Sequence, residues 1–281
     1  MNYIELIRNA RIKFNSIVCF GMDPVLEKIP VSGSPYKKII TFYERILNKM
    51  LQRNVTPGAI KPNFAFYAQY GLQGIKALAA LITMYKSAGF PVILDVKRSD
   101  IGTTAEAYAK ESFIFFSADA VTLNPFMGYD SIQPFIKNFP DKGYYILTKT
   151  SNKSSSDVQD LSCEGKTIYE HIAYKILDWY HPGIGSVVGA TFPQQLECIL
   201  DIYITSGKII PLLIPGIGTQ GGSLVETLNI LKRDTNINIH RINSSSAINY
   251  AYLNDKRKHY AVAAVNALSS LNDEIGNALH G

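Results

Sequence analysis

The sequence has few cysteines, and they are scattered. Only Cys19, Cys163 and Cys198 occur in 281 residues. No Cys-x-x-Cys or His-Glu-x-x-His spacing is found, so the common zinc sites are excluded. An odd, sparse set of cysteines is typical of proteins in a reducing compartment, and we therefore expect a cytoplasmic protein.

Long hydrophobic runs and dense runs of one charge are also missing. No apolar run approaches the ~20 residues that a membrane-spanning helix needs. The segment 1–8 is amphipathic and contains Glu5, so we do not expect a secretory signal there. The net charge is +5, and the strongest basic cluster, at 256–258, is better explained as a solvated surface. We expect neither a membrane nor a nucleic acid as partner.

Length and composition favour one large domain. The chain has 281 residues, of which 47% are hydrophobic, and α/β barrels of this length often form a single domain. No low-complexity linker divides the sequence, and the serine-rich stretch 151–156 is short enough to be a loop. We predict one domain over residues 1–281.

A strand-then-helix pattern repeats along the chain and predicts an α/β fold, a (β/α)8 TIM barrel with an extra N-terminal helix at 2–14. A doubly wound open sheet is the main alternative, but it would usually carry a nucleotide-binding loop after its first strand. The sequence there is FGMDP (20–24), without a GxGxxG or GxxxxGK[ST] motif. Strands are expected at 16–22, 57–62, 91–97, 118–124, 143–149, 185–190, 208–214 and 237–243, and the following helices at 36–52, 72–88, 103–117, 131–138, 164–180, 193–205, 222–233 and 258–279.

Polar residues follow every expected strand. The active site of such a barrel lies at the carboxyl ends of its strands. Any one of these residues could be a simple strand stop or turn former. Their convergence on one rim favours a binding site. The residues are Asp23, Lys61, Asn63, Asp95, Lys97, Asn124, Thr150, Ser151, Asn152, Thr191, Asn243, Ser244, Ser245 and Ser246.

The third strand end is the most informative. Side chains alternate along a strand, so Asp95 and Lys97 should point the same way. Asp100 adds a second carboxylate just beyond. A structural salt bridge would account for the pair alone, but with Lys61 on the same rim we expect an alternating charge cluster inside a concave site.

The loop after the seventh strand is rich in glycine, from Gly216 through Gly218 to Gly222. Loops at this place in barrels commonly bind phosphate, because glycine lets backbone N–H groups approach an anion and a helix begins directly after. Gln220 can add a side-chain donor. A turn made only for its geometry is the alternative.

With these motifs in order, the chain resembles the orotidine 5′-monophosphate decarboxylases of the longer bacterial type. The most specific element is Asp-x-Lys-x-x-Asp-Ile-x-x-Thr, here Asp95, Lys97, Asp100, Ile101 and Thr104. The short motif also occurs in related sugar-phosphate barrels, whereas the full ordered set is more specific. Supporting segments are FGMDP (20–24), KPNFAFY (61–67), ADAVTLNPFMGYDS (118–131), TSN (150–152), GATFP (189–193) and PGIGTQGG (215–222).

The resemblance implies a cofactor-free, metal-free decarboxylation of orotidine 5′-monophosphate to UMP, the last step of pyrimidine nucleotide synthesis. Lys97 would protonate C6 of the pyrimidine, and Asp95 would crowd the substrate carboxylate and hold Lys97. Lys61 would hold Asp95 and contact the ribose, whose hydroxyls Asp23 would bind. Ser151 would contact the ring.

The resemblance also implies a homodimer with shared active sites. Asp100, Ile101 and Thr104 would reach into the partner's site. Gln220 would contact the phosphate.

One position departs from the family pattern. The family usually has an arginine after the eighth strand, where this chain has Ser246. Arg241 lies five residues earlier and is not an obvious substitute. Backbone N–H groups at Ser245 and Ser246 can still bind phosphate. We predict weaker substrate binding, or a cation supplied from elsewhere, because a charge-assisted contact contributes roughly 1.5–3 kcal/mol.

Two alternatives stay open. A magnesium-dependent sugar-phosphate lyase or synthase would share the Asp-x-Lys-x-x-Asp core and require a metal. A non-catalytic nucleotide-binding relic would account for the missing arginine, although Lys61, Asp95, Lys97 and Asp100 are intact.

Overall fold

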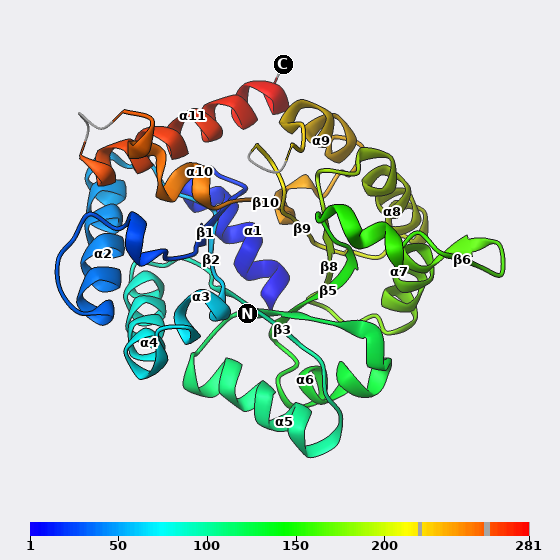
Figure 1. The fold of residues 1–281 in the computed structure, drawn as a ribbon. Helices are drawn as coiled ribbons and strands as arrows, with labels where there is room; N and C mark the ends of the chain where they lie inside the picture. The colour runs from blue at the N-terminus through cyan, green and yellow to red at the C-terminus, as the bar shows by residue number, and fades with distance from the viewer. Residues whose placement is uncertain (219–220, 256–258, 281) are drawn as a thin grey trace.

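The eight expected strands form one parallel sheet that closes on itself. The computed structural model describes residues 1–218, 221–255 and 259–280. Its eight-stranded sheet has the order β2-β1-β10-β9-β8-β5-β4-β3. Parallel bridges Ile60–Val92 and Asn63–Asp95 join β2 to β3, so the predicted barrel is confirmed (Figure 1). The strands are β1 (Val18–Met22), β2 (Ala59–Pro62), β3 (Ile93–Arg98), β4 (Ala120–Leu123), β5 (Gly143–Lys149), β8 (Ile184–Val188), β9 (Leu212–Ile214) and β10 (Arg241–Ser244).

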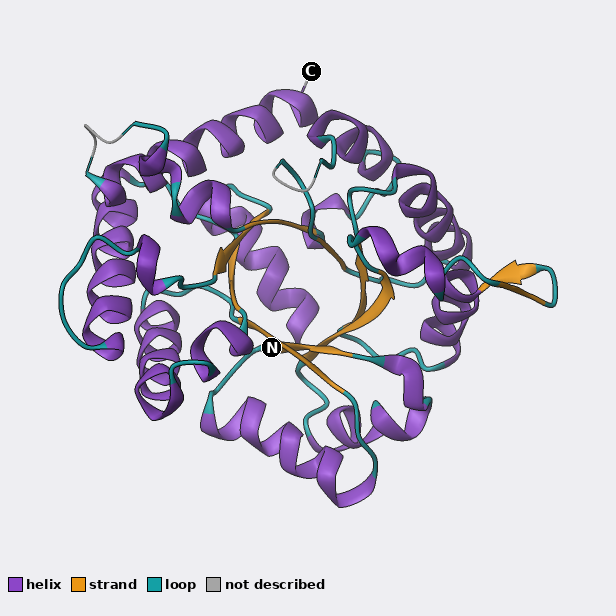
Figure 2. Ribbon diagram, viewed as in Figure 1, coloured by secondary structure: helices purple, strands orange, loops and turns teal. Residues whose placement is uncertain are grey.

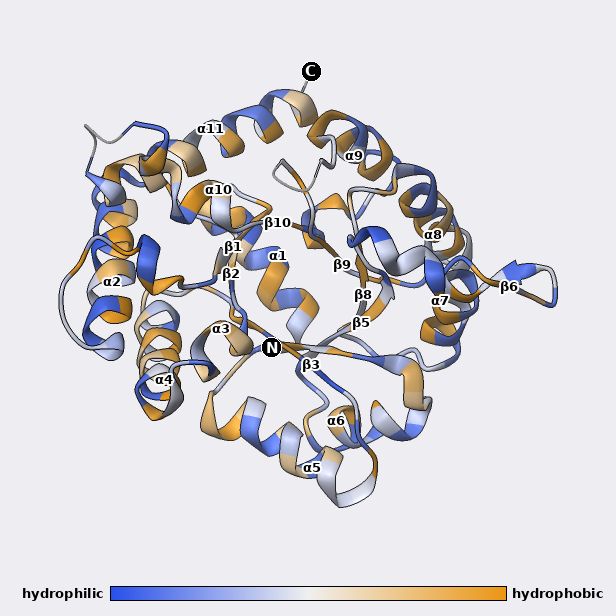
Figure 3. Ribbon diagram, in the orientation of Figure 1, coloured by the Kyte–Doolittle hydropathy of each residue, from blue (hydrophilic) through white to orange (hydrophobic). Residues whose placement is uncertain are grey.

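Helices surround the ring of strands (Figure 2). Helix α2 illustrates why: Ile39, Phe42, Tyr43 and Ile46 recur at helical spacing and are buried against the barrel. Hydrophobic and hydrophilic residues accordingly alternate along the outer helices (Figure 3). No described helix has the length and hydropathy that a membrane crossing requires. The helices are α1 (Tyr3–Phe14), α2 (Pro35–Arg53), α3 (Phe64–Ala68), α4 (Gly71–Ser87), α5 (Gly102–Lys110), α6 (Gln133–Asn138), α7 (Ile168–Asp178), α8 (Pro193–Ser206), α9 (Leu224–Leu231), α10 (Ser246–Asn249) and α11 (Tyr260–His280).

Helix α1 closes the floor of the barrel, at the amino ends of the strands. Asn2 and Glu5 form a capping box that starts the helix. Tyr3, Ile4 and Ile7 then pack with the inward-facing residues of the strands in a core separate from the one under the outer helices. Arg241 is fully buried and donates hydrogen bonds to the carbonyl oxygens of Ile7, Asn238 and His240.

The eighth expected strand was placed too early. Residues Ile237–Ile239 form a short 3₁₀ turn, and β10 begins only at Arg241. Asp234 is the cause: it accepts hydrogen bonds from the Asn236 N–H (2.7 Å) and from Nε2 of His240 (3.0 Å). These two contacts bend the chain where a strand would need it extended.

Other boundaries also differ from the prediction: the seventh strand was expected at 208–214, whereas β9 covers only Leu212–Ile214. Residues 162–167 form a small hairpin, β6 (Ser162–Cys163) with β7 (Lys166–Thr167), and a Thr167–Glu170 capping box then starts α7 at Ile168. Helix α5 ends at Lys110 and continues as a π-helical turn over Glu111–Phe115. The serine-rich stretch includes a 3₁₀ turn, Lys153–Asp157.

Candidate active site

A cavity of about 640 Å³ lies at the carboxyl ends of the strands. Its wall combines charged and polar side chains with apolar ones from inside the barrel. Of the residues predicted for the site, twelve line it: Asp23, Lys61, Asn63, Asp95, Lys97, Thr150, Ser151, Asn152, Gly216, Asn243, Ser245 and Ser246.

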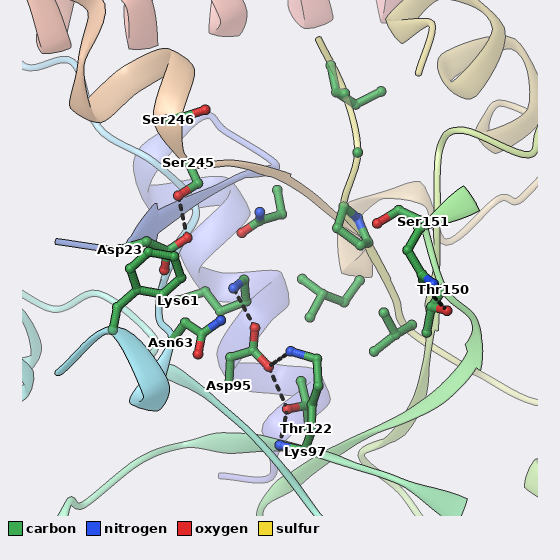
Figure 4. A pocket seen from close by; sticks show the side chains of 18 of the residues that line it. Asp23, Lys61, Asn63, Asp95, Lys97, Thr122, Thr150, Ser151, Ser245 and Ser246 are labelled. Atoms are coloured by element: carbon green, nitrogen blue, oxygen red, sulfur yellow. Dashed lines mark hydrogen bonds and ion pairs between the residues drawn. The ribbon is translucent and has the colours of Figure 1, made fainter. Parts of the chain in front are cut away.

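Asp95 is the centre of the charged group in this cavity. Lys61 donates a 2.8 Å hydrogen bond to Oδ2 of Asp95, and Lys97 donates a 2.6 Å hydrogen bond to Oδ1. The two ammonium groups reach the carboxylate from different sides (Figure 4). The side chain of Lys61 is 6% exposed and that of Lys97 48% exposed, so Lys97 is the cation presented to a ligand.

The charges stabilise one another despite their burial. Burial alone would raise the pKa of Asp95, but the two lysines outweigh it and hold this pKa well below its usual range. Burial would lower the pKa of Lys61, but Asp95 outweighs it and raises this pKa. Asp95 is therefore a carboxylate and Lys61 an ammonium at neutral pH.

A bulge in β3 presents Lys97. The pairing of β3 with β4 shifts register between Leu94 and Arg98, and Lys97 has a φ of +47°, in the left-handed region. The hydroxyl oxygen of Thr122, on β4, accepts the N–H groups of Val96 (3.1 Å) and Lys97 (3.0 Å). Simple strand alternation predicted that Asp95 and Lys97 share a side, but it did not predict this distortion.

Two buried oxygen atoms in the cavity wall lack a hydrogen-bond partner among the described residues. One is Oδ1 of Asp23, whose other oxygen accepts a hydrogen bond from the Ser245 hydroxyl. The other is Oδ1 of Asn243, a residue that is only 8% exposed. Buried polar atoms normally have partners, so each of these oxygens keeps an unused capacity to accept a hydrogen bond.

A further cation, Lys28, belongs to the cavity wall. Lys28 lines the cavity, and its ammonium group is 5.3 Å from the centre of the Tyr250 ring. The backbone around Lys28 is fixed from the chain segment after Ser246: Tyr252 donates to the Lys28 carbonyl (2.6 Å), and the Val25 N–H donates to the Tyr250 hydroxyl (2.7 Å). Sequence reasoning missed Lys28 because it belongs to a loop turn, Leu26–Lys28.

Ser151 is held by the neighbouring strand end. Thr191 donates a 2.9 Å hydrogen bond to the Ser151 carbonyl. A side chain at Gly189 would come within 2.6 Å of Cα of Ser151, so this close approach requires glycine. An ion pair between the buried Lys149 and Asp160 (2.7 Å) holds the following loop against β5.

The remaining predicted residues lie outside the cavity lining. Asp100 accepts a hydrogen bond from the Ile101 N–H (2.8 Å), and Thr104 lies on an exposed stretch of α5. Asn124 accepts a hydrogen bond from the Phe126 N–H (3.0 Å) and so caps a 3₁₀ turn. Gly218, with a φ of +77°, belongs to the turn after β9, whereas Gln220 lies outside the described residues.

Comparisons with known proteins identify the family of the chain. Residues 48–258 match the model of the "Orotidine 5'-phosphate decarboxylase / HUMPS family". The chain belongs to this family. Among curated family members, the orotidine 5'-phosphate decarboxylase of Ralstonia nicotianae is 39% identical over 98% of both chains. The enzyme of that name from Cupriavidus necator is 37% identical over 100% of both.

Solved structures of the family have the same fold. The Leishmania donovani OMP decarboxylase aligns over 100% of both chains with a TM-score of 0.79 and 29% identity. The Leishmania donovani UMP synthase aligns with a TM-score of 0.77 and 32% identity, over 98% of this chain and 56% of that one. The barrel described here therefore corresponds to one part of that longer protein.

Proposed function

We propose that this chain, as a single domain, decarboxylates orotidine 5′-monophosphate to UMP without a cofactor or metal. Membership of the family and the names of its full-length relatives support this reaction. The observation that carries the proposal is the Lys61–Asp95–Lys97 group, held by hydrogen bonds of 2.8 and 2.6 Å inside a cavity large enough for a nucleotide.

Lys97 is the proposed acid. When the bond between C6 and the carboxylate breaks, carbon dioxide leaves and the electron pair stays on C6, without a conjugated group to accept it. The ammonium group of Lys97 stabilises this carbanion and then transfers a proton to C6. Lys97 is left as a neutral amine and takes a proton from solvent, and its 48% exposed side chain suits this exchange.

Asp95 and Lys61 prepare that step. Asp95 lies beside Lys97 and orients its ammonium group, and it also brings a negative charge close to the substrate carboxylate, which disappears in the reaction. Lys61 compensates the charge of the buried Asp95. This allows Asp95 to stay ionised when Lys97 becomes neutral.

The ribose and the ring would occupy the rest of the cavity. Oδ1 of Asp23 and Oδ1 of Asn243 have no partner among the described residues and would accept hydrogen bonds from ribose hydroxyls. Asn63 lines the same wall next to Lys61. Ser151, held by Thr191 at 2.9 Å, would contact the pyrimidine.

The phosphate would lie at the rim of the cavity formed by the loop after β9 and the start of α10. Gly216, Ser245 and Ser246 line the cavity there, and the proposal is that backbone N–H groups of this part of the wall face the anion. Lys61 and Lys97 both pair with Asp95, whereas Lys28 forms no ion pair among the described residues. We therefore propose Lys28 as the cation that contacts the phosphate, together with Gln220, which the family resemblance assigns to it.

We further propose a homodimer with shared sites. Asp100, Ile101 and Thr104 lie outside the cavity of their own chain, as expected of residues that serve a partner's site. Ile101 is 49% and Phe126 87% exposed, and a 2.9 Å hydrogen bond from the Asn124 N–H to the Arg98 carbonyl joins the chain segments that carry them. Exposed apolar side chains of this size favour an interface.

The first test is the ultraviolet absorbance of orotidine 5′-monophosphate mixed with purified protein and EDTA. We expect the substrate absorbance to fall with the natural chain and to stay constant with Lys97→Ala. A reaction that needs added magnesium would favour a metal-dependent lyase instead. Binding of UMP without any turnover would favour a nucleotide-binding relic.

A further inference from the structure

We propose that Thr122 is a positioning residue for Lys97 in the reaction proposed above. Thr122 is 1% exposed, lies on β4 and lines the cavity. It contacts both the backbone of Lys97 and the side chain of Asp95, and so connects the proposed acid to the group that orients it.

All the hydrogen-bonding positions of the Thr122 hydroxyl are occupied. Its oxygen accepts the N–H groups of Val96 (3.1 Å) and Lys97 (3.0 Å), and its hydrogen is donated to Oδ1 of Asp95 at 2.9 Å. A hydroxyl has one donor and two acceptor positions, so this arrangement fills all three. An apolar side chain of the same shape would supply none of these three hydrogen bonds.

These bonds replace the regular pairing of β3 with β4. The register shift between Leu94 and Arg98 leaves Val96 and Lys97 without their normal strand partners, and Lys97 adopts a φ of +47°. Such a backbone is unfavourable for a residue with a side chain and persists only where the surroundings enforce it. Thr122 supplies that enforcement and so directs the Lys97 side chain into the cavity.

The bond to Asp95 has a second consequence during turnover. Oδ1 of Asp95 is shared by the Lys97 ammonium (2.6 Å) and the Thr122 hydroxyl (2.9 Å). When Lys97 gives up its proton, the Thr122 hydroxyl and Lys61 still hold the carboxylate in place. Asp95 is then oriented to receive Lys97 again after it is reprotonated.

The test compares Thr122→Val with Thr122→Ser. Because a misplacement of about 1 Å can cost on the order of 100-fold in rate, we expect kcat of Thr122→Val to fall by about 10- to 100-fold. The dissociation constant of UMP should change by about twofold or less, because Thr122 positions the acid more than it binds the product. Thr122→Ser keeps the hydroxyl and should recover most of kcat.

Thr148→Val is the matched control. Thr148 is also buried on a barrel strand and bonds to the Ile146 carbonyl and to Ser186, but it does not line the cavity. The Thr148→Val substitution should lower the melting temperature with little change in kcat. If Thr122→Val keeps its kcat, or if UMP affinity falls in parallel with kcat, the positioning role is wrong.

Crystal structures of the two Thr122 variants keep this proposal separate from the proposed reaction. We expect Thr122→Val to lose the positive φ of Lys97 or its 2.6 Å bond to Asp95, and Thr122→Ser to keep both. An unchanged Lys97 in Thr122→Val would overturn the inference even if the enzyme is active. Absence of turnover by the natural chain would instead refute the reaction, while the structures would still report on Thr122.

Discussion

Replacing Ser246 with arginine should tighten the binding of UMP. Ser246 begins α10 at the rim of the cavity, it is exposed, and it stands where the family resemblance leads us to expect an arginine. A guanidinium group there can reach a phosphate that we place beside Lys28 and Ser245. Arginine binds phosphate with two parallel hydrogen bonds, which lysine does not do.

The size of the gain follows from the exposure of the site. A hydrogen bond to a charged group contributes about 1.5–3 kcal/mol in general. Solvent screens an exposed pair, so we expect about 1–2 kcal/mol at this rim. That range corresponds to a dissociation constant roughly 5- to 30-fold lower. Lys28→Ala should weaken UMP binding several-fold in the natural chain, and by less in the Ser246→Arg variant, because the two cations would serve the same phosphate.

Isothermal titration with UMP and with uridine is the assay. Uridine lacks the phosphate, so its affinity should not change in Ser246→Arg. Ser270→Arg adds the same charge on an exposed position of α11, outside the cavity lining, and should leave both affinities unchanged. The reasoning is refuted if Ser246→Arg folds normally and binds UMP no better, or if uridine gains as much as UMP.

Three further predictions concern the same site. Mixing inactive Lys97→Ala subunits with inactive Asp100→Ala subunits should restore turnover, because one mixed site then has both groups; mixtures that stay inactive while forming dimers would argue against shared sites. The depressed pKa of Asp95 stabilises the folded state above the ordinary carboxyl pKa of about 4. The melting temperature should therefore fall as the pH drops below this value, and it should fall less in Asp95→Asn. Scanning calorimetry between about pH 5 and 3 can measure both changes. Asn243→Ala should reduce the difference in affinity between UMP and its 2′- or 3′-deoxy analogues, because the variant lacks the oxygen that would accept a ribose hydroxyl. An unchanged difference for both analogues would show that Asn243 is not part of the ribose site.

The sequence was sufficient for the barrel because its strands are buried on both faces. Segments such as residues 143–149 are nearly continuous apolar runs, and they match β5 at both ends. The segment 237–243 was misjudged because Ile237 and Ile239 are as apolar as strand residues, whereas the contacts of Asp234 that bend this segment depend on its folded surroundings. The local sequence pattern could not show that the contacts of Asp234 prevail over the strand preference of these apolar residues.

The candidate site was predictable in part for a similar reason. Asp95 and Lys97 stand out as charges at the end of an apolar strand. Thr122 does not, because a β-branched residue inside the run Ala-Val-Thr-Leu is indistinguishable from an ordinary core residue. Lys28 was also missed, since the hydroxyls of Tyr250 and Tyr252, more than two hundred residues later, help to hold its turn at the cavity.

The sealed floor of the barrel decides how molecules travel to and from the proposed reaction. Tyr3, Ile4 and Ile7 of α1 fill the end of the barrel opposite the cavity, and Arg241 fastens the helix there. Substrate and nucleotide product would therefore enter and leave through the same opening, at the rim that carries Lys28, Ser245 and Ser246. Residues that bind the phosphate at this opening would therefore affect the release of the product as well as the entry of the substrate.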